Sequence, residues 1–179
     1  IVRSLIDEGV VAVKNGSFDI TDKIETAVIP QNITDLLMAR IDRLEEKTRE
    51  LVKVVSVIGR SFFYRVLSDV GKRIEELDDR LSYLKGVQLI REHTRMEEIE
   101  FIFKHALVQE AAYESILQKR KKELHLEVGN SIESIFDNNL HEFYGMLAFH
   151  YLKAENYEKA EKYMLKAGEQ ALNMSASSE

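Results

Sequence analysis

The sequence has 179 residues, 45% hydrophobic and 31% charged, with a formal net charge of -6. This length accommodates one ordinary domain or two small ones, and the composition is typical of a helix-rich globular protein rather than a disordered segment. The negative charge argues against a general attraction to nucleic acid or anionic lipid. Because the chain has no cysteine, disulfides, thiolate metal sites and a cysteine nucleophile are excluded.

The ends and the hydropathy of the chain bear on its location. No apolar run approaches the roughly 20 residues that a helix needs to cross a bilayer, so we expect no membrane partner and a cytoplasmic location. The sequence begins at Ile1, inside a helical pattern and without an initiator Met. We therefore expect a segment of a longer polypeptide that carries no signal peptide.

The first part of the chain predicts a hairpin between two helices. Residues 1–7 have the pattern of a helix end. Apolar residues at 10–13 and 18–20 flank Asn15-Gly16, a dipeptide typical of tight hairpin turns. Helical periodicity then resumes over residues 34–44.

Three helices and a two-stranded hairpin are expected next. The predicted elements are helices at residues 46–58, 62–70 and 74–85 and strands at 87–91 and 99–103. The third helix has a continuous apolar stripe, and a polar loop over residues 93–98 joins the two strands. This order is that of a winged-helix domain with a small β-hairpin wing, which we place at residues 45–103.

Every periodic segment after His105 is helical. Segments at residues 105–117, 121–136, 140–153 and 157–172 predict antiparallel helices over 104–179. The last pair has the spacing of a tetratricopeptide repeat, carried by Tyr144, Leu147, Ala148, Tyr151, Ala160, Met164 and Ala167. A single repeat cannot bury its own face, so we expect further repeats beyond residue 179. The predicted fold class is mainly α.

His105 is the candidate site residue, because it stands where the last strand becomes a helix. One interpretation is a partly buried histidine bonded to a backbone group, which the residue type alone favours. The other is a contact to phosphate, because the free N–H groups at a helix start attract anions.

The remaining charged and histidine patterns do not favour DNA binding or catalysis. The helix over residues 74–85 presents four carboxylates where a DNA-reading helix usually has Lys and Arg. The basic cluster at residues 119–122 lies beside Glu123 and Glu127 and has no interleaved aromatic residues. No pair of histidines has the one-turn helical spacing of a zinc site, and no phosphate loop or nucleophile elbow is present. We expect no catalytic residue, no metal site and no nucleic-acid partner.

Three stretches together resemble the signal-transduction ATPases with numerous domains. The resemblance is to the branch found in large bacterial proteins with nucleotide-cyclase or kinase domains and in multidomain transcriptional regulators. It covers nearly the whole chain. The stretches are Ile29-Pro30 with Leu36-Leu37-Met38-Ala39-Arg40-Ile41-Asp42-Arg43-Leu44, Val57-Ile58-Gly59-Arg60-Ser61-Phe62, and Phe103-Lys104-His105-Ala106-Leu107-Val108-Gln109-Glu110-Ala111-Ala112-Tyr113-Glu114-Ser115.

The resemblance implies a regulatory role without catalysis in this segment. Residues 1–44 would be the C-terminal end of the ATPase lid region, and the winged helix would be an internal clamp that keeps the nucleotide-bound resting state closed. His105 would contact the β-phosphate of ADP held by the missing core. Plant and animal relatives have Met-His-Asp there, whereas this chain has Lys104-His105-Ala106, so only the histidine is shared.

The same resemblance implies the cofactors and partners. The segment itself would hold no cofactor, while the parent ATPase would bind ADP or ATP with Mg, with or without an adenylate or guanylate cyclase domain. Its partners would be the upstream ATPase core, the downstream repeats or output domain, and a protein bound by the helical repeats. Two alternatives remain open: a helical-repeat scaffold for protein interaction and a winged-helix DNA-binding domain.

Overall fold

The computed structural model describes residues 11–14, 17–20 and 33–176. The predicted helix at residues 1–7, the turn Asn15-Gly16 and Pro30 lie outside them. The elements in chain order are β1 (Val11–Lys14), β2 (Ser17–Ile20), α2 (Ile33–Asp42), α3 (Glu46–Ile58), β3 (Ser61–Phe63), α4 (Tyr64–Val70), α5 (Leu77–Gly86), β4 (Ile90–Arg95), β5 (Glu98–Phe103), α6 (Ala106–Glu114), α7 (Gln118–Ile135), the 3-10 helix η2 (Asp137–Phe143), α8 (Tyr144–Lys153) and α9 (Tyr157–Ala176).

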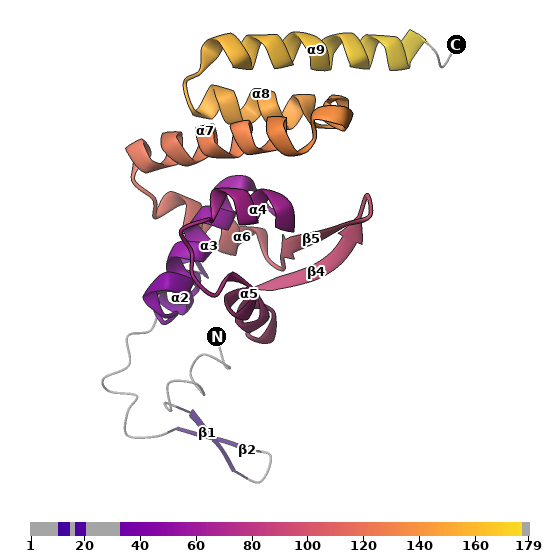
Figure 1. Ribbon diagram of the computed structural model, residues 1–179. Helices are drawn as coiled ribbons and strands as arrows, with labels where there is room; N and C mark the ends of the chain where they lie inside the picture. Colours follow the sequence, from indigo (N-terminus) through magenta and orange to yellow (C-terminus); the bar gives the residue numbers. More distant parts are fainter. Residues whose placement is uncertain (1–10, 15–16, 21–32, 177–179) are drawn as a thin grey trace.

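The expected mainly helical fold with a small antiparallel sheet is confirmed (Figure 1). The predicted N-terminal hairpin is also found, since β1 and β2 pair antiparallel with Val11 opposite Ile20 and Lys14 opposite Ser17.

A second sheet of three antiparallel strands has the order β3-β5-β4. The prediction that Phe62 begins a helix was wrong, because Phe62 lies in β3 opposite Phe101 of β5. Its ring centroid lies 5.6 Å from that of Phe101 and 6.1 Å from that of Phe103. Burying this aromatic cluster requires the extended conformation, and the partner strand is distant in sequence. A local helical pattern therefore misidentified the element.

Strand β4 lies later than the predicted strand at residues 87–91, β5 begins one residue earlier than predicted, and the loop between them is shorter. Only Met96 and Glu97 form the turn, and both have positive φ, at 54° and 61°. Such pairs are typical of two-residue hairpin turns that match the strand twist. His93 is opposite Glu100, and their side chains pair with Nε2–Oε2 at 2.8 Å. Polar composition indicated a loop here, whereas cross-strand charge pairs extend the ladder.

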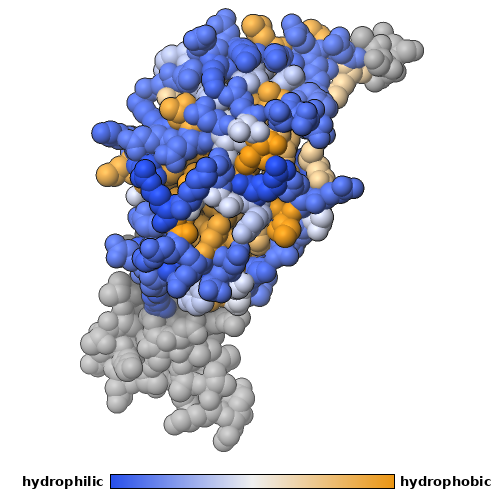
Figure 2. All heavy atoms as spheres, viewed as in Figure 1, coloured by the Kyte–Doolittle hydropathy of each residue, from blue (hydrophilic) through white to orange (hydrophobic). Residues whose placement is uncertain are grey.

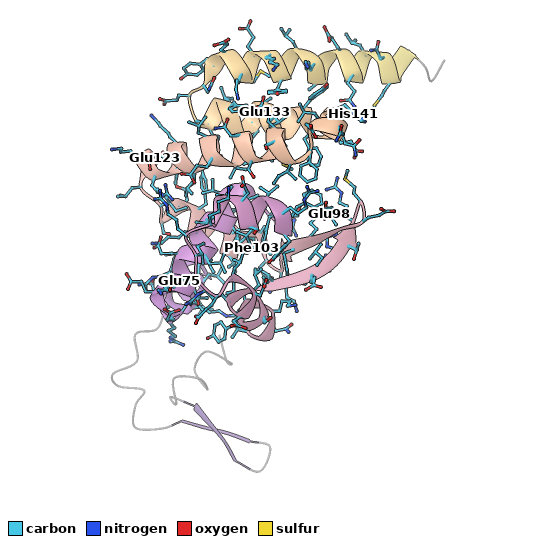
Figure 3. The ribbon with its side chains drawn as sticks, in the orientation of Figure 1. Glu75, Glu98, Phe103, Glu123, Glu133 and His141 are labelled. Atoms are coloured by element: carbon cyan, nitrogen blue, oxygen red, sulfur yellow. The ribbon has the colours of Figure 1, made fainter. Side chains whose placement is uncertain are left out.

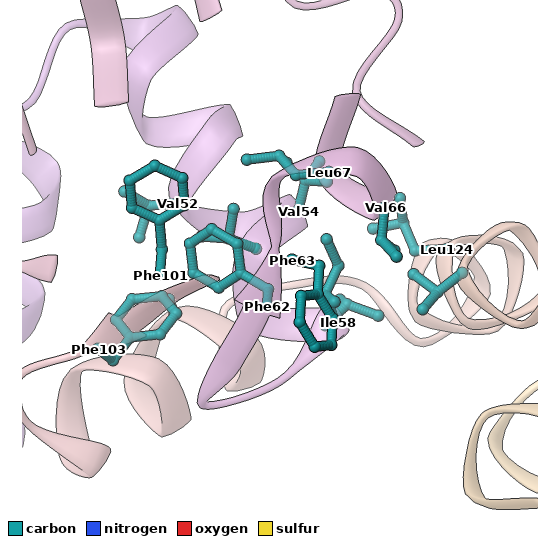
Figure 4. Packing of buried hydrophobic residues seen from close by; sticks show 14 of the residues in the cluster. Val52, Val54, Ile58, Phe62, Phe63, Val66, Leu67, Phe101, Phe103 and Leu124 are labelled. Carbon is teal, nitrogen blue, oxygen red and sulfur yellow. The ribbon is translucent and has the colours of Figure 1, made fainter. Parts of the chain in front are cut away.

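Helix α3 is at the centre of the hydrophobic core (Figure 4). Glu45 caps its start by accepting from the backbone N–H of Lys47 at 3.4 Å. Leu51 and Val55 are fully buried, and a buried aliphatic side chain of this size contributes about 1.5–3 kcal/mol. The helix packs against α4, α6 and α7 as well as β3, so its burial joins the sheet to the later helices.

The helices α7, α8 and α9 run antiparallel in a stack beyond the sheet (Figure 1). The predicted single helix over residues 140–153 is instead η2 followed by α8, because Phe143 leaves helical geometry with φ at -114°. This bend brings Phe143 onto Phe136, with ring centroids 4.3 Å apart. Phe63 of β3 lies 5.4 Å from the ring centroid of Phe136. The aromatic contact therefore docks the helical stack on the sheet.

Candidate functional site

The backbone around His105 is fixed by the sheet. The N–H of Phe103 donates to the carbonyl of Arg60 at 2.9 Å, and the N–H of Lys104 donates to that of Leu89 at 3.0 Å. The Lys104 ammonium also donates to the side-chain oxygen of Gln88. His105 follows at the N-cap of α6, with φ -129° and ψ 126°. The imidazole is therefore attached to a rigid support.

The side chain of His105 is exposed. Its carbonyl accepts from the N–H of Val108 at 3.1 Å, but its imidazole makes no capping hydrogen bond. The interpretation of His105 as a partly buried, backbone-bonded histidine is therefore wrong about its burial, because the side chain is exposed. The arrangement offers an imidazole beside the N-terminus of α6, where the first N–H groups have no partner within the helix. A contact to phosphate stays a prediction.

The polar face of α5 is not a basic surface. Arg80 is buried and turns back toward α3, where its guanidinium pairs with Glu45. The same group donates to the hydroxyl of Thr48 at 2.8 Å. Lys85 pairs with Glu92 of β4 at 2.6 Å. Both basic side chains that the sequence assigned to this helix are engaged in ion pairs within the fold.

The basic cluster at residues 119–122 is dispersed over several acidic partners. Arg120 lies 3.3 Å from Glu123, Lys122 lies 2.7 Å from Glu155, and the buried Lys121 lies 2.9 Å from Glu114. These pairs neutralise much of the cluster, so the residues do not act together as an electrostatic surface for phosphates.

The sequence did not identify a buried histidine network, which consists of Tyr113, His125, His150 and the carbonyl of Ile58. The Nδ1 atoms of His125 and His150 are 2.9 Å apart, and Nε2 of His125 lies 3.1 Å from the Tyr113 hydroxyl. The His150 ring also bonds the backbone of Ile58. Each histidine is 1% exposed. A signal existed: His125 continues the buried stripe of α7 formed with Lys121, Val128 and Ile132.

Burial keeps both imidazoles neutral. Desolvation, reinforced by the positive charges of Lys153 and Lys121, lowers the pKa of His125 to about 4. Desolvation and the neighbouring His125 lower the pKa of His150 to about 3, although the hydrogen bond to Ile58 opposes the shift. The two rings therefore act as hydrogen-bonding groups without charge at neutral pH.

A second polar cluster joins the helices of the stack around Glu133 of α7 (Figure 3). Its carboxylate accepts from the hydroxyls of Tyr151 and Tyr163 and from the ammonium of Lys159 at 2.5 Å. Burial by itself raises the pKa of Glu133, but these hydrogen bonds outweigh burial and lower the pKa to about 2. Each donor is satisfied, so the cluster stabilises the stack and leaves no free reactive group.

Two kinds of site are not found among the described residues. Within residues 11–14, 17–20 and 33–176, no group of three or more His, Asp and Glu side chains could hold a metal ion. The helices in that same part of the chain include none with the length and apolar content needed to cross a membrane.

The chain was also compared with known proteins. Neither the protein-family models nor the curated proteins contain a match to this sequence.

Proposed function

We propose that this chain is a non-catalytic regulatory segment of a multidomain signalling ATPase. In this proposal residues 45–103 form a winged helix that clamps the nucleotide-bound resting state, and the following tetratricopeptide-like helices relay its movement to a partner or output domain. The observation that carries the proposal is the exposed imidazole of His105, held beside a helix N-terminus by the last strand of the sheet.

The order of elements supports the winged-helix assignment. One helix, a short strand, two helices and a two-stranded hairpin follow one another from α3 to β5, and the first strand joins the hairpin in one sheet. The inward ion pair of Arg80 with Glu45 favours an internal, protein-facing role for this unit over DNA reading, because it removes a cation from the surface that would meet phosphates.

The geometry at His105 supports a contact to a nucleotide phosphate. A donor to a charged oxygen is worth about 1.5–3 kcal/mol, which biases an equilibrium between two states by about tenfold or more. The bonds of Phe103 and Lys104 to Arg60 and Leu89, the residues just before β3 and β4, mean that movement of the phosphate moves the sheet with it. A local contact would thereby be transmitted to α3 and α6.

The test uses the longer polypeptide that contains the expected ATPase core. We would purify the wild type and His105→Ala, then measure the ADP that each retains. We expect the variant to retain about tenfold less ADP at matched concentrations, because the charge-assisted hydrogen bond is lost. His141→Ala is the matched control, since His141 is another exposed histidine, in η2, and it should retain ADP as the wild type does.

Equal retention of ADP by all three proteins would overturn the nucleotide contact. A filter-binding assay of the 179-residue chain with duplex DNA tests the alternative of a DNA-binding winged helix. Tight binding with a steep salt dependence would establish a DNA-reading winged helix instead.

A protein-interaction scaffold is the second candidate, and the outer surface of α9 favours it. Met164, Leu165 and Leu172 are 51%, 62% and 71% exposed. In Figure 2, hydrophobic atoms reach the surface between hydrophilic ones along the part of the molecule where α9 lies. The substitution Leu165→Glu on this surface should abolish binding of a partner without changing ADP retention, which separates the two candidates.

A further inference from the structure

The buried histidine network connects four helices that are far apart in the sequence. Ile58 ends α3, Tyr113 lies in α6, His125 in α7 and His150 in α8. The carbonyls at the end of α3 have no partner within their own helix. The side chain of Gln109 donates to the carbonyl of Ser56 at 2.7 Å, and His150 bonds the carbonyl of Ile58. The network therefore completes the end of the central helix.

The hydrogen bonds determine where each proton lies. The carbonyl of Ile58 can only accept, and Nδ1 of His150 faces His125, so we assign the donating N–H of His150 to Nε2. A neutral imidazole carries one N–H. Nδ1 of His150 must therefore accept, and Nδ1 of His125 must donate. Nε2 of His125 then accepts from the Tyr113 hydroxyl.

This arrangement has capacity for one additional proton but not for two. A first proton can bind Nε2 of His125, and the Tyr113 hydroxyl would then turn to accept. A second proton would have to bind Nδ1 of His150, which would place two N–H groups against each other across 2.9 Å. That contact is repulsive, and both charges would lie in a buried site.

The surrounding groups oppose protonation. Lys121 lies within 4.2 Å of the centre of the Tyr113 ring, and Lys153 raises the local positive potential. The ring of Phe149 is packed edge to face against His125, with centroids 5.7 Å apart. Charged and titratable groups from four helices surround the two histidines, and some of them lie on the far side of the neighbouring Tyr151. They are Tyr113 and Glu114 of α6, Lys121 and Glu133 of α7, Lys153 of α8 and Lys159 of α9.

We propose that the buried histidine network is a proton-sensitive contact that holds the α7–α8 pair on α3 and α6 and releases it on acidification. Proton uptake stabilises a state in which the α7–α8 pair has moved away and the imidazoles meet water, while α3 and the three-stranded sheet stay folded. The inference concerns how the helical stack is attached and does not depend on nucleotide binding.

Amide hydrogen exchange of the 179-residue chain, followed by NMR between pH 7.5 and 4, tests the proposal. Protection factors, which correct for the intrinsic effect of pH on exchange, should fall in α7 and α8 before they fall in α3 and β5. The opening equilibrium should increase by up to about tenfold per pH unit for each proton taken up. Nitrogen shifts of the imidazoles at pH 7 should give the Nδ1–H form for His125 and the Nε2–H form for His150.

Two substitutions remove the titration, and each keeps one of the two hydrogen bonds that its histidine makes. His125→Asn places an amide nitrogen where Nδ1 donates, and His150→Gln places one where Nε2 donates. Each variant should show a flatter pH dependence of protection in α7 and α8. The control His141→Asn, on the exposed surface of η2, should follow the wild type.

Three outcomes would overturn the proposal. The first is constant protection of α7 and α8 in the wild type between pH 7.5 and 4. The second is simultaneous loss of protection in the helical stack and in α3, which indicates a general effect on stability. The third is an unchanged pH dependence in both variants. If neither variant folds, the wild-type titration alone decides between release and simultaneous unfolding.

Discussion

Tyr151 and Tyr163 lie parallel, with ring centroids 5.9 Å apart and planes 12° apart, and their hydroxyls converge on the carboxylate of Glu133. The first tyrosine is in α8, the second is in α9 and the carboxylate is in α7. One carboxylate therefore connects the three helices of the stack. Because burial and Glu133 disfavour the phenolate, the pKa of each tyrosine is raised above its ordinary value, and both remain donors.

Replacing this carboxylate should destabilise the fold. Glu133→Gln removes the charge that accepts from Lys159 at 2.5 Å and from two hydroxyls, so we expect a loss of about 1.5–3 kcal/mol in the free energy of unfolding. Urea unfolding measures this loss of free energy. Glu123→Gln is the control, because Glu123 and its partner Arg120 are both 47% exposed, and such pairs contribute little. Equal effects of the two substitutions would contradict the structural role of Glu133.

Replacing each of two glycines by alanine should change the stability of the protein in opposite directions. A Cβ at Gly129 of α7 would lie 3.0 Å from ring atoms of Tyr151, whereas nothing lies within 4 Å of a Cβ at Gly168 of α9. Gly129→Ala should cost about 1–3 kcal/mol through overpacking. Gly168→Ala should stabilise the protein by up to about 1 kcal/mol, because Gly is a poor helix former. Thermal unfolding of the pair measures both, and stabilisation by Gly129→Ala would show that the rings are not in close contact.

The stability of the wild type should decrease as the pH falls from about 6.5 to 4. The folded pKa values of His125 and His150, about 4 and about 3, lie below the ordinary 6.5. The unfolded state therefore binds protons in this range when the folded state does not. Each histidine contributes up to about 1.4 kcal/mol per pH unit, and this contribution is fully present above pH 6.5. Urea unfolding at several pH values in His125→Asn and His150→Gln should give a shallower slope.

The carboxylate of Glu133 acts in a lower pH range than the histidines. Because its folded pKa is about 2, its contribution is present above its ordinary pKa and is lost only as the pH falls from about 4.5 toward 2. Glu133→Gln should therefore leave the slope between pH 6.5 and 5 unchanged, and the histidine variants should change it. An altered slope in that range for Glu133→Gln would show that the two clusters are coupled.

The contact between α3 and α5 should depend on one arginine more than on its neighbours. Arg80 is 9% exposed and bonds Glu45, Thr48 and the carbonyl of Glu75. Arg80→Ala should cost about 2 kcal/mol or more, because it removes a buried guanidinium together with its hydrogen bonds to Thr48 and to the carbonyl of Glu75. Lys47→Ala, on the same contact, removes an ion pair whose side chains are 55% and 72% exposed and should cost less than about 1 kcal/mol. Urea unfolding of the two variants measures both losses of free energy.

Local sequence patterns predicted the elements whose stabilising contacts are close in the chain. Helix α9 was expected over residues 157–172 and begins at Tyr157, because its apolar spacing is continuous. Strand β3 and the division of residues 140–153 at Phe143 were missed. The first depends on pairing with β5, and the second on the contact of Phe143 with Phe136 and Phe63. Periodicity within one window carries no information about such partners.

The same distinction applies to the candidate sites. His105 was identified because it stands at a boundary between two periodicities, and its exposure agrees with a role at the surface. The pair of His125 and His150 was not identified, because its partners lie 25 residues apart on different helices. Each histidine fitted the buried stripe of its own helix, but the sequence did not reveal that the two stripes face each other.

The position of β5 between β3 and β4 has a consequence for the synthesis of the chain. The β4–β5 hairpin can form as soon as its residues leave the ribosome, since its strands are adjacent in sequence. Strand β3 is made earlier but has no partner until β5 has emerged, so Phe62 stays exposed to water during that interval. The nascent chain therefore presents an unpaired aromatic strand, which is the kind of surface that chaperones protect from aggregation.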